Sequence, residues 1–426
     1  MIDSRILRES PEKIKENLEK RNITNFPFEE LLELDKKRRE LISKNQKLKE
    51  ERNKISLEVA KAKSTGGDSQ ELISKMRLTS DEITETDRET QHVATRSNEL
   101  LAALPNFLGA DVPIGKDETA NMELRTWGER KKGNLDHIDI SAIFDLIDID
   151  RAAKTSGARF YFLKRDLTRL NYALISFALD YLRARGFVLI QPPYMLKREA
   201  IGGAVILGDF EEVIYKIENE DLYLIGTSEH AIAAMHMEEI FDGSDLPIHY
   251  AGVSPCFRKE AGAHGRDTKG IFRVHQFEKV EQFVYCKPSE SEKEHQFLLQ
   301  NAEGFMQELG IPYRVMLLSS GDMGKVSAKT YDIEGWIPSQ EKYRELISCS
   351  NVTDFQSRAL GIKYREKAHE ESRFLHTLNS TLVATERTMV AILENYFQRD
   401  EKVIKVPLPL VKYMNSQTEI TPVDKR

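Results

Sequence analysis

Charged and aromatic residues gather in the stretch from Phe257 to Phe283, which also contains a polar, glycine-containing loop. We expect a strand, this loop and a second strand. Because side chains alternate across a strand, Arg258 and Glu260 share one face of the first. One face of the second carries Arg273, His275, Phe277, Lys279 and Glu281. An aromatic ring flanked by cations and carboxylates can stack a base while the cations hold phosphates. An exposed charged sheet face would explain the charges alone, but it explains the central Phe277 less well.

Three further segments combine polar residues in patterns that could support chemistry. Thr227, Ser228 and Glu229 follow an apolar run, which by itself is the signature of a helix N-cap. A second segment runs from Glu345 to Asn351. The third, from Leu378 to Tyr396, predicts a strand followed by a helix with Arg387 in its first turn. An arginine gains nothing from the helix dipole at that position, so an anionic partner such as phosphate would explain it.

The composition limits the class of protein. The chain has 426 residues, of which 40% are hydrophobic and 31% charged, and this predicts two or three domains in a globular protein. It holds no apolar run long enough to span a membrane and no signal-like N-terminus, so we expect a cytoplasmic protein. The net charge of −7 argues weakly against nucleic-acid binding, but the charge is unevenly distributed.

Cysteine and glycine patterns exclude several kinds of site. Cys256, Cys286 and Cys349 are too far apart for a disulfide framework or a CxxC metal site, and no HExxH occurs. We therefore expect reduced thiols and no protein-held zinc. The absence of GxGxxG and GxxxxGK[ST] disfavours dinucleotide-binding and P-loop folds.

A seven-residue repeat marks the part of the chain from about residue 28 to 104, which has no proline between Pro27 and Pro105. The first ladder is Leu34, Leu41, Leu48, Ile55 and Ala62. After a break at 64–69, two parallel ladders are Leu72, Thr79, Thr86, Val93 and Leu100, and Met76, Ile83, Thr90, Ser97 and Leu104. Two heptad runs around a Gly-Gly break predict an antiparallel coiled-coil hairpin with arms of about 50 Å.

The first arm of this hairpin is strongly basic. Between Lys36 and Lys63 there are eleven Lys or Arg residues and only four acids, whereas the second arm is acidic on balance. One interpretation is a solvated coiled coil with ion pairs between its helices. The other is a basic stripe that lies along phosphates.

From Pro105 onward, short β-rich runs such as 222–225 and 283–285 alternate irregularly with helical stretches. One predicted helix, Leu167–Arg185, ends at Gly186. Because there is no regular βαβ order, we expect an α+β fold with an antiparallel sheet. The predicted domains are therefore residues 1–105, with the long hairpin at about 28–104, and residues 106–426.

Taken together, these segments resemble the signature motifs of class II aminoacyl-tRNA synthetases, and in detail those of the seryl-tRNA synthetase family. The Arg258–Glu281 region resembles motif 2, the segment with Arg387 resembles motif 3, and Gly186–Pro193 resembles motif 1, the dimer-forming element. The stretches GTSEHAIAAMH, FRKEAGAHGRDTKG, TYDIEGWIPSQ, ISCSNVTDFQ and HTLNSTLVA are similar to serine-specific sequences. The resemblance covers essentially the whole chain and implies a catalytic domain built on an antiparallel sheet, preceded by the hairpin.

The resemblance implies a serine–tRNA ligase that forms seryl-adenylate and pyrophosphate from serine and ATP. Arg258 would hold the α-phosphate, Arg387 the γ-phosphate, and Phe277 would stack on the adenine. Other residues implied for ATP are Lys259, Glu260, Val274, Glu345, Leu346, Ile347 and Ser348. Those implied for serine are Thr227, Ser228, Glu229, Glu281 and Thr381, among which Glu281 is the strongest candidate. With Arg258 and Arg387, Glu281 completes the implied catalytic set.

Partners and a cofactor are implied in the same way. The hairpin would bind the long variable arm of tRNA(Ser), and of tRNA(Sec) where present, and the protein would form a homodimer. Glu345 and Ser348 would coordinate Mg²⁺ together with ATP. Strict alternation places these two on opposite faces of a strand, so joint binding requires a bulge or a twist there.

Two departures from the family pattern stand out. Glu386 occupies a place that usually holds a small residue, where a carboxylate could weaken the neighbouring Arg387. Lys412 stands where arginine is usual, in a segment that resembles the family's terminal strand.

Two other functions remain open. One is a related ligase that loads an amino acid onto a carrier protein, which the intact hairpin argues against. The other is a catalytically silent RNA-binding paralogue, which the presence of Arg258, Glu281 and Arg387 argues against.

Overall fold

The protein is described by a computed structural model that covers residues 1–133, 135–206, 208, 212–260 and 269–422. The chain divides into two compact units. The smaller unit comprises Asp3–Glu19 and Ile23–Leu104, and the larger comprises Met1–Ile2, Lys20–Asn22 and the chain from Pro105 onward. The short segment Lys20–Asn22 thus belongs to the larger unit, although both of its neighbours in the chain belong to the smaller one.

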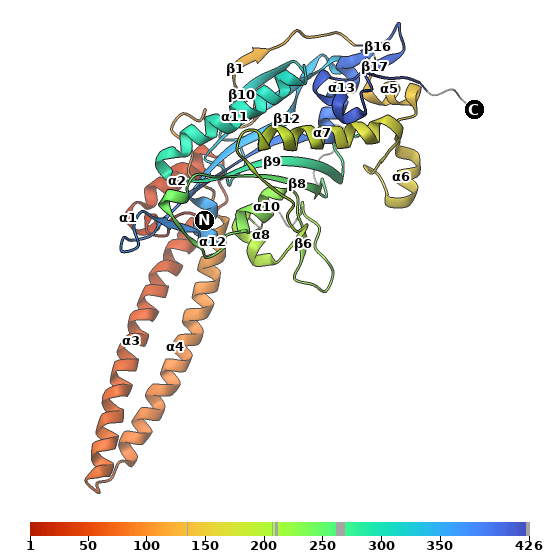
Figure 1. Ribbon diagram of the computed structural model, residues 1–426. Helices are drawn as coiled ribbons and strands as arrows, with labels where there is room; N and C mark the ends of the chain where they lie inside the picture. Colours follow the sequence, from red (N-terminus) through yellow and green to blue (C-terminus); the bar gives the residue numbers. More distant parts are fainter. Residues whose placement is uncertain (134, 207, 209–211, 261–268, 423–426) are drawn as a thin grey trace. The chain divides into compact units, whose positions relative to one another are not determined.

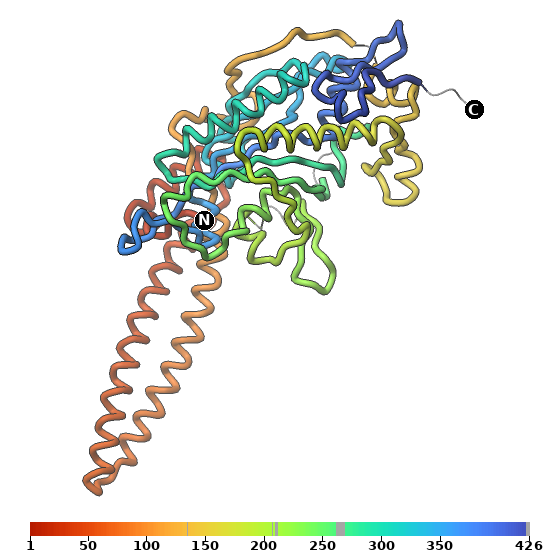
Figure 2. The backbone as a smooth tube through the Cα atoms, viewed as in Figure 1, coloured from red at the N-terminus to blue at the C-terminus, as the bar shows by residue number. Residues whose placement is uncertain are grey.

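The smaller unit is helical and contains the predicted hairpin. Its helices are α1 (Ile6–Glu9), α2 (Pro11–Lys20), α3 (Phe28–Ser64) and α4 (Gln70–Ala103). α3 and α4 pack along their lengths and are joined at 65–69, as the tube in Figure 2 shows. The predicted antiparallel pair and the position of its break are confirmed.

The seam between α3 and α4 mixes apolar and polar side chains. Leu41, Ile55 and Val59 of α3 are buried with Ile83 and Val93 of α4. Polar residues are buried in the same seam, namely Asn45, Thr79, Thr86 and Ser97. Asn45 Nδ2 donates a hydrogen bond of 2.6 Å to Asp87 Oδ1. Because a polar seam position specifies register at a cost in stability, this seam fixes the alignment of the two helices more than it strengthens their association.

An eight-stranded sheet forms the centre of the larger unit (Figure 1). Its strands, in spatial order, are β1 (Met122–Trp127), β10 (Tyr313–Leu317), β11 (Lys329–Ile337), β12 (Lys342–Thr353), β15 (His376–Ala384), β9 (Gln276–Cys286), β8 (Ile248–Phe257) and β4 (Val188–Ile190). Every neighbouring pair is antiparallel except β4 with β8. This architecture confirms the predicted α+β class.

Helices and smaller sheets complete this unit. The helices are α5 (His137–Phe144), α6 (Ile149–Ser156), α7 (Arg165–Arg183), α8 (Arg198–Ala204), α10 (Ser228–Ala234), α11 (Ser291–Glu308), α12 (Phe355–Leu360) and α13 (Thr385–Tyr396). The smaller sheets join β14 (Arg373–Phe374), β13 (Lys363–Arg365) and β7 (Ile240–Asp242); β16 (Phe397–Gln398), β17 (Val403–Lys405) and β18 (Glu419–Ile420); β2 (Ile147–Asp148) and β3 (Phe162–Leu163); and β5 (Met195–Leu196) and β6 (Tyr223–Leu224).

The main hydrophobic core lies under α7, α11 and α13, which pack against β8, β9, β11, β12 and β15. An aromatic cluster joins two of these helices: the ring centroid of Phe305 on α11 lies 4.9 Å from that of Phe177 and 5.4 Å from that of Tyr181, both on α7. A second core, beneath α8 and α10, includes Phe283 and Tyr285 of β9. The helix predicted at Leu167–Arg185 is confirmed with slightly shifted ends.

One part of the predicted strand pattern was wrong. The β8–β9 ladder ends at the pair Phe257 and Gln276, so Arg258 and Glu260 lie beyond the first strand and Arg273–His275 precede the second. A single backbone hydrogen bond of 2.9 Å from Arg258 N to His275 O continues the pairing. Residues 261–268 of the predicted loop lie outside the described residues.

Two further sequence features can be compared directly. Cys256, Cys286 and Cys349 are buried free thiols. In the described part of the chain, no helix is both long enough and apolar enough to cross a membrane.

Truncating the aromatic cluster tests the core. We expect Phe305→Ala to lower the free energy of unfolding by about 3–5 kcal/mol, because it removes a fully buried ring and leaves a cavity. Leu408→Ala is the control, since Leu408 is 84% exposed, and it should change stability by less than about 0.5 kcal/mol. Urea unfolding of both variants measures the difference. Equal stability of the two variants would contradict the assigned core.

Candidate active site

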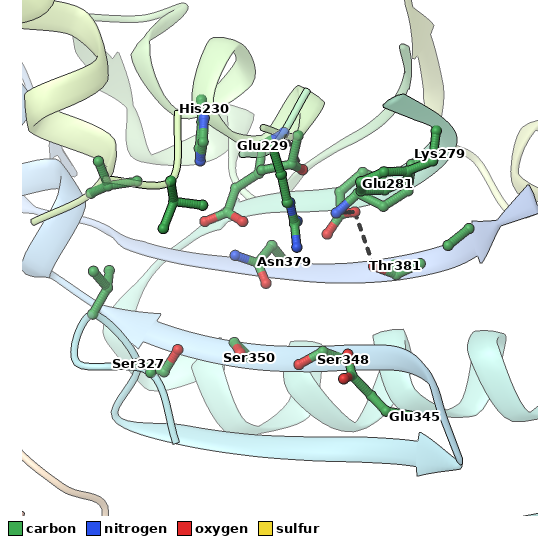
Figure 3. Close-up of a pocket in the computed structure, with 18 of the residues that line it drawn as sticks. Glu229, His230, Lys279, Glu281, Ser327, Glu345, Ser348, Ser350, Asn379 and Thr381 are labelled. Atoms are coloured by element: carbon green, nitrogen blue, oxygen red, sulfur yellow. Dashed lines mark hydrogen bonds and ion pairs between the residues drawn. The ribbon is translucent and has the colours of Figure 1, made fainter. Parts of the chain in front are cut away.

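A cavity of about 510 Å³ opens over β9, β12 and β15, on the sheet face opposite the main core (Figure 3). Its lining includes the first turns of α10 and α13 and the residues just after β8. Polar and charged side chains predominate among the residues labelled in Figure 3. The cavity therefore gathers residues from each of the four sequence segments that were singled out for their chemistry.

Glu281 lies at the floor of this cavity. It is only 2% exposed and stands opposite Thr381 across the β9–β15 ladder. Thr381 Oγ1 donates a hydrogen bond of 3.2 Å to Glu281 Oε2, and Lys279 Nζ lies 2.5 Å from the same oxygen. A buried carboxylate with a cation and a hydroxyl partner is held in one fixed orientation.

Glu229 reaches the cavity from the first turn of α10. Thr227 caps this helix by accepting a hydrogen bond of 3.2 Å from Glu229 N, which confirms the predicted N-cap. Gln356 Nε2 donates to Glu229 Oε1 at 3.0 Å. Burial, with a smaller contribution from the charge of Glu281, raises the pKa of Glu229 to about 7.

Arg258 and Phe277 form one wall. The guanidinium carbon of Arg258 lies 5.1 Å from the ring centroid of Phe277, within cation–π range, and Nε donates to Gly226 O at 3.1 Å. Next to them, Arg273 Nη1 lies 2.8 Å from Glu260 Oε2. His275, predicted in the same row, instead stacks on Phe160 with ring centroids 5.1 Å apart.

Arg387 and Glu345 stand at another side of the cavity. Arg387 Nη1 lies 3.1 Å from Glu345 Oε1 and donates to the backbone oxygen of Glu345 at 3.0 Å. The nearby guanidinium lowers the pKa of Glu345. Arg387 is the third residue of α13, as predicted. A cation at that end of a helix is unfavourable with respect to the dipole and is offset here by Glu345.

Of the two distortions that would allow the predicted metal site, a bulge or a twist, the structure has a bulge. Ile333 pairs with Ile347, but Glu334 pairs with Glu345, so Leu346 is the extra residue on β12. The bulge brings the side chains of Glu345 and Ser348 to the same face, and both line the cavity (Figure 3). A carboxylate and a hydroxyl are hard oxygen donors of the kind that Mg²⁺ prefers, so the residues present fit such an ion.

Sequence comparison agrees with the geometry. Residues 1–108 match a family model described as "Seryl-tRNA synthetase N-terminal domain", and residues 212–396 match one described as "tRNA synthetase class II core domain (G, H, P, S and T)". A protein named serine–tRNA ligase from Nitrosopumilus maritimus is 53% identical over 99% of this chain and 100% of its own length.

The chain belongs to the seryl-tRNA synthetase family. A second relative of that name, from Thermococcus sibiricus, is 48% identical over 100% of this chain and 99% of its own length.

Solved structures of seryl-tRNA synthetases share the fold over the full chain. The enzyme from Pyrococcus horikoshii, complexed with ATP, superposes with a TM-score of 0.92 at 45% identity and covers 100% of both chains. The cytoplasmic serine–tRNA ligase from Naegleria fowleri, in complex with AMP, gives a TM-score of 0.86 at 35% identity, covering 100% of this chain and 99% of its own.

Most residues implied by the seryl-tRNA synthetase resemblance line the one cavity. They are Thr227, Glu229, Arg258, Glu260, Val274, Phe277, Glu281, Glu345, Leu346, Ser348, Thr381 and Arg387. The side chains of two others point elsewhere. Ser228 is fully buried and donates to Gly252 O at 3.2 Å, and the Ile347 side chain lies in the main hydrophobic core. Lys259 is tied through its backbone N–H to Val213 O at 2.6 Å.

Several polar residues of the cavity lie outside the set of site residues implied by the seryl-tRNA synthetase resemblance, among them Lys279, Ser350 and Asn379. Lys279 is the partner of Glu281, Ser350 lies near Ser348, and Asn379 hydrogen-bonds with Glu229. A signal existed, because each is two positions along the same strand from a residue already implied by the seryl-tRNA synthetase motifs. Period two therefore places each of them on the cavity face.

The two departures from the seryl-tRNA synthetase pattern have structural explanations. Glu386 accepts hydrogen bonds from the Tyr161 hydroxyl, from Glu278 N at 3.0 Å and from Thr385 Oγ1 at 3.0 Å. Its carboxylate is thus held by groups other than Arg387. Lys412 lies in a 3₁₀ segment, Leu408–Met414, with Nζ 3.9 Å from Asp180 Oδ2. The strand expected there was wrong, because Pro407 and Pro409 cannot donate to a ladder.

The burial of Glu386 makes a prediction about pH. Burial raises its pKa from 4.5 to about 7. Below about pH 4.5 both the folded and the unfolded state carry the proton, whereas between these values only the folded state keeps it. This residue's contribution to stability is therefore present at low pH and is lost as the pH rises through about 7, by an amount on the order of 3 kcal/mol.

Glu386→Gln removes this titration. We expect its free energy of unfolding to fall less than that of wild type between about pH 5 and about pH 8, when urea unfolding is compared across that range. Any pH-independent offset reflects altered hydrogen bonds and does not enter the test. Glu371→Gln, at an exposed carboxylate, should follow wild type. Parallel curves for wild type and Glu386→Gln would contradict the assignment.

Proposed function

We propose that the chain works as a serine–tRNA ligase. It activates serine with ATP to seryl-adenylate and pyrophosphate, then transfers the seryl group to the 3′ end of tRNA(Ser), and of tRNA(Sec) where such a tRNA is present. The observation that carries this proposal is a single cavity that holds two arginines, Arg258 and Arg387, together with the buried Glu281–Thr381 pair. The names of full-length relatives at 53% and 48% identity support the same reaction.

Arg258 and Arg387 would act on the phosphates. A serine carboxylate oxygen forms a bond to the α-phosphorus, the bond to the bridging oxygen breaks, and pyrophosphate leaves. Arg258 would stabilise the charge that builds on the α-phosphate, and Arg387 would hold the γ-phosphate. Phe277 would stack its ring on the adenine. Glu260 would accept a hydrogen bond from the adenine amino group. Arg273, 2.8 Å from Glu260, holds that carboxylate in place.

Glu281 and Thr381 would recognise the hydroxyl group of the serine side chain. In a buried pocket, alanine would leave polar groups without a partner, which is penalised heavily, whereas threonine can be excluded only by lack of room for a methyl group. Thr227 and Glu229 complete the pocket, and Glu229 is the acceptor available for the ammonium group of serine. Lys279, which lies against the Glu281 carboxylate, holds it in one orientation.

Glu345 and Ser348 would hold a divalent cation, Mg²⁺, that arrives with ATP. Such an ion neutralises phosphate charge and favours departure of pyrophosphate. In the described part of the chain, no group of three or more His, Cys, Asp or Glu side chains is arranged to hold a metal. Two protein oxygens plus phosphate oxygens are the usual way in which Mg²⁺ is bound in nucleotide sites.

Residues 1–105 would bind tRNA, and the α3–α4 hairpin would lie along its long variable arm. The contacts separate the basic residues of α3 into two groups. Lys37, Lys44 and Lys49 pair with Glu89, Glu82 and Asp87 of α4. The side chains of Lys47, Lys54 and Lys61 are exposed, seven residues apart, and make no hydrogen bond or ion pair with the described residues. Their spacing puts them on one stripe, about 10 Å apart along the helix.

Residues 106–426 would be the catalytic domain, and the protein would form a homodimer in the cytoplasm. Large apolar side chains are exposed on β4, an edge strand, and on α7 next to it: Val188 is 57%, Leu189 39% and Tyr172 60% exposed. Burial of such a patch favours association. These elements flank Gly186–Phe187, the start of the motif 1 resemblance.

The activation reaction is tested by amino-acid-dependent ATP–pyrophosphate exchange with each of the twenty amino acids. We expect exchange with serine alone, and a loss of about 100-fold or more in Glu281→Ala, because the pocket loses its buried acceptor. Glu371→Ala, at an exposed carboxylate, is the matched control. Exchange with another amino acid would overturn the serine assignment, and none at all from folded protein with Mg²⁺ would favour the silent RNA-binding alternative.

The role of the hairpin is tested by a triple variant, Lys47→Gln, Lys54→Gln and Lys61→Gln. We expect the KM for tRNA to rise about tenfold and its salt dependence to weaken by about two in log–log slope, because three phosphate contacts are lost. Serine-dependent exchange without tRNA should not change. The matched control replaces Lys37, Lys44 and Lys49, which are already ion-paired. Equal effects of the two triple variants would argue against a specific stripe.

A further inference from the structure

A buried arginine lies directly after α2. Arg21 is 6% exposed, and its hydrogen bonds within the described residues all go to backbone carbonyl oxygens: Nε to Asn106 O at 3.0 Å, Nη1 to Gly324 O at 3.4 Å and Nη2 to Ser327 O at 2.6 Å. Burial lowers its pKa to about 10. Burying a guanidinium without a carboxylate partner carries a desolvation cost. The planar set of N–H donors of Arg21 offsets part of that cost only through the carbonyl groups that it contacts.

Asn106 supplies the complementary contacts. Its backbone N–H donates to Lys325 O at 2.8 Å and its Nδ2 donates to Val326 O at 2.9 Å. Arg21 and Asn106 together therefore satisfy four consecutive carbonyl groups, those of residues 324–327. The same Nδ2 also donates to Val352 O at 2.7 Å, at the end of β12. Segment 324–327 is thus fastened to the sheet through side chains that lie far away in the sequence.

Segment 324–327 is part of the cavity wall. All four of its residues line the cavity, and Figure 3 places Ser327 at the end where Glu229 and Asn379 lie, away from Glu345. The segment precedes β11 and has only one short-range backbone bond of its own, from Ser327 N to Gly324 O at 3.1 Å. Its conformation therefore depends on the donors of Arg21 and Asn106.

Both donors stand where the chain passes between the two compact units. Arg21 belongs to Lys20–Asn22, the three residues of the larger unit that are flanked on both sides by residues of the smaller one. Asn106 is the second residue after the chain enters the larger unit at Pro105. Both crossings are thus tied to the same stretch of cavity wall.

We propose that Arg21 is a positioning residue of the catalytic cavity. Together with Asn106, it holds the 324–327 wall in place, so that the two chain crossings into the helical unit set the shape of the cavity at its Glu229 end. This assignment rests on the proposed serine activation, since that end of the cavity would receive serine. Arg21 touches no substrate and acts only through the wall.

The test uses the full-length chain and compares four variants. Arg21→Met keeps the length of the side chain but removes every donor, and Arg21→Lys keeps the charge but cannot span the carbonyls of 324 and 327. Asn106→Ala removes the Nδ2 donor that reaches the same segment from the second crossing. Arg8→Met, at an exposed arginine of α1, is the matched control. Circular dichroism establishes which variants fold.

Exchange kinetics separate positioning from loss of folded protein. We expect Arg21→Met and Asn106→Ala each to raise the KM for serine about tenfold, which is less than the roughly 100-fold cost of a misplacement by about 1 Å, while the KM for ATP changes less than about twofold. Arg21→Lys should fall between wild type and Arg21→Met. The double variant should be less than additive in log KM, because both side chains act on one segment. Arg8→Met should match wild type.

Hydrogen exchange gives a second readout that does not depend on activity. In folded Arg21→Met or Arg21→Lys, peptides that contain residues 324–327 should lose protection while peptides from α11 keep theirs. Unchanged protection together with an unchanged KM for serine would overturn the proposal. A wild-type enzyme without serine exchange would defeat the proposed function, and hydrogen exchange would then still decide whether Arg21 positions the wall. If Arg21→Met does not fold, Arg21→Lys and Asn106→Ala decide it.

Discussion

The register between β9 and β15 is the constraint on which the site depends. It places Glu281 opposite Thr381 on the cavity face, and it turns Val280 and Gln282 toward the helices on the other face. A slip of one residue would exchange these two sets, moving a carboxylate into the hydrophobic core and an apolar chain into the cavity. Burial of the hydrophobic core under α7 and α11 therefore also fixes which side chains face the cavity.

Charge compensation then sets the properties of the cavity. Lys279 lies against Glu281, Arg387 against Glu345 and Arg273 against Glu260. Each of these pairs holds its two groups in a fixed orientation. Glu229 and Glu386 are held mainly by neutral hydrogen-bond donors, and for that reason burial raises the pKa of each to about 7.

The helical unit follows different rules. A hairpin that is two helices thick has little interior, so its stability comes from one narrow seam and from ion pairs along its sides. Several of those pairs use cations of α3, whereas the side chains of Lys47, Lys54 and Lys61 make no such pair with the described residues. The buried Arg21 shows a third use of a cation: it donates to two carbonyl groups of the 324–327 cavity wall from a place where the chain passes between the two units, and Asn106 serves the other two.

The sequence by itself determined the fold class, the hairpin with its break and, through the family resemblance, twelve of the residues that line the cavity. Heptad spacing and strand alternation are local patterns, and the motif segments carry their residues at short, fixed intervals. Local patterns could not locate the end of the β8–β9 ladder, because that end depends on where the two strands diverge in space. They also could not show that Glu386 turns away from Arg387.

Only the tertiary structure decided the contacts between segments that lie far apart in the chain. Sequence alternation called for a bulge or a twist between Glu345 and Ser348, but only pairing with β11 could make Leu346 the extra residue. Arg21 and Asn106 gave no signal at all, because their importance comes from carbonyl groups more than two hundred positions away. Backbone carbonyls are identical in every residue, so no sequence pattern reveals which of them need a donor until the chain has folded.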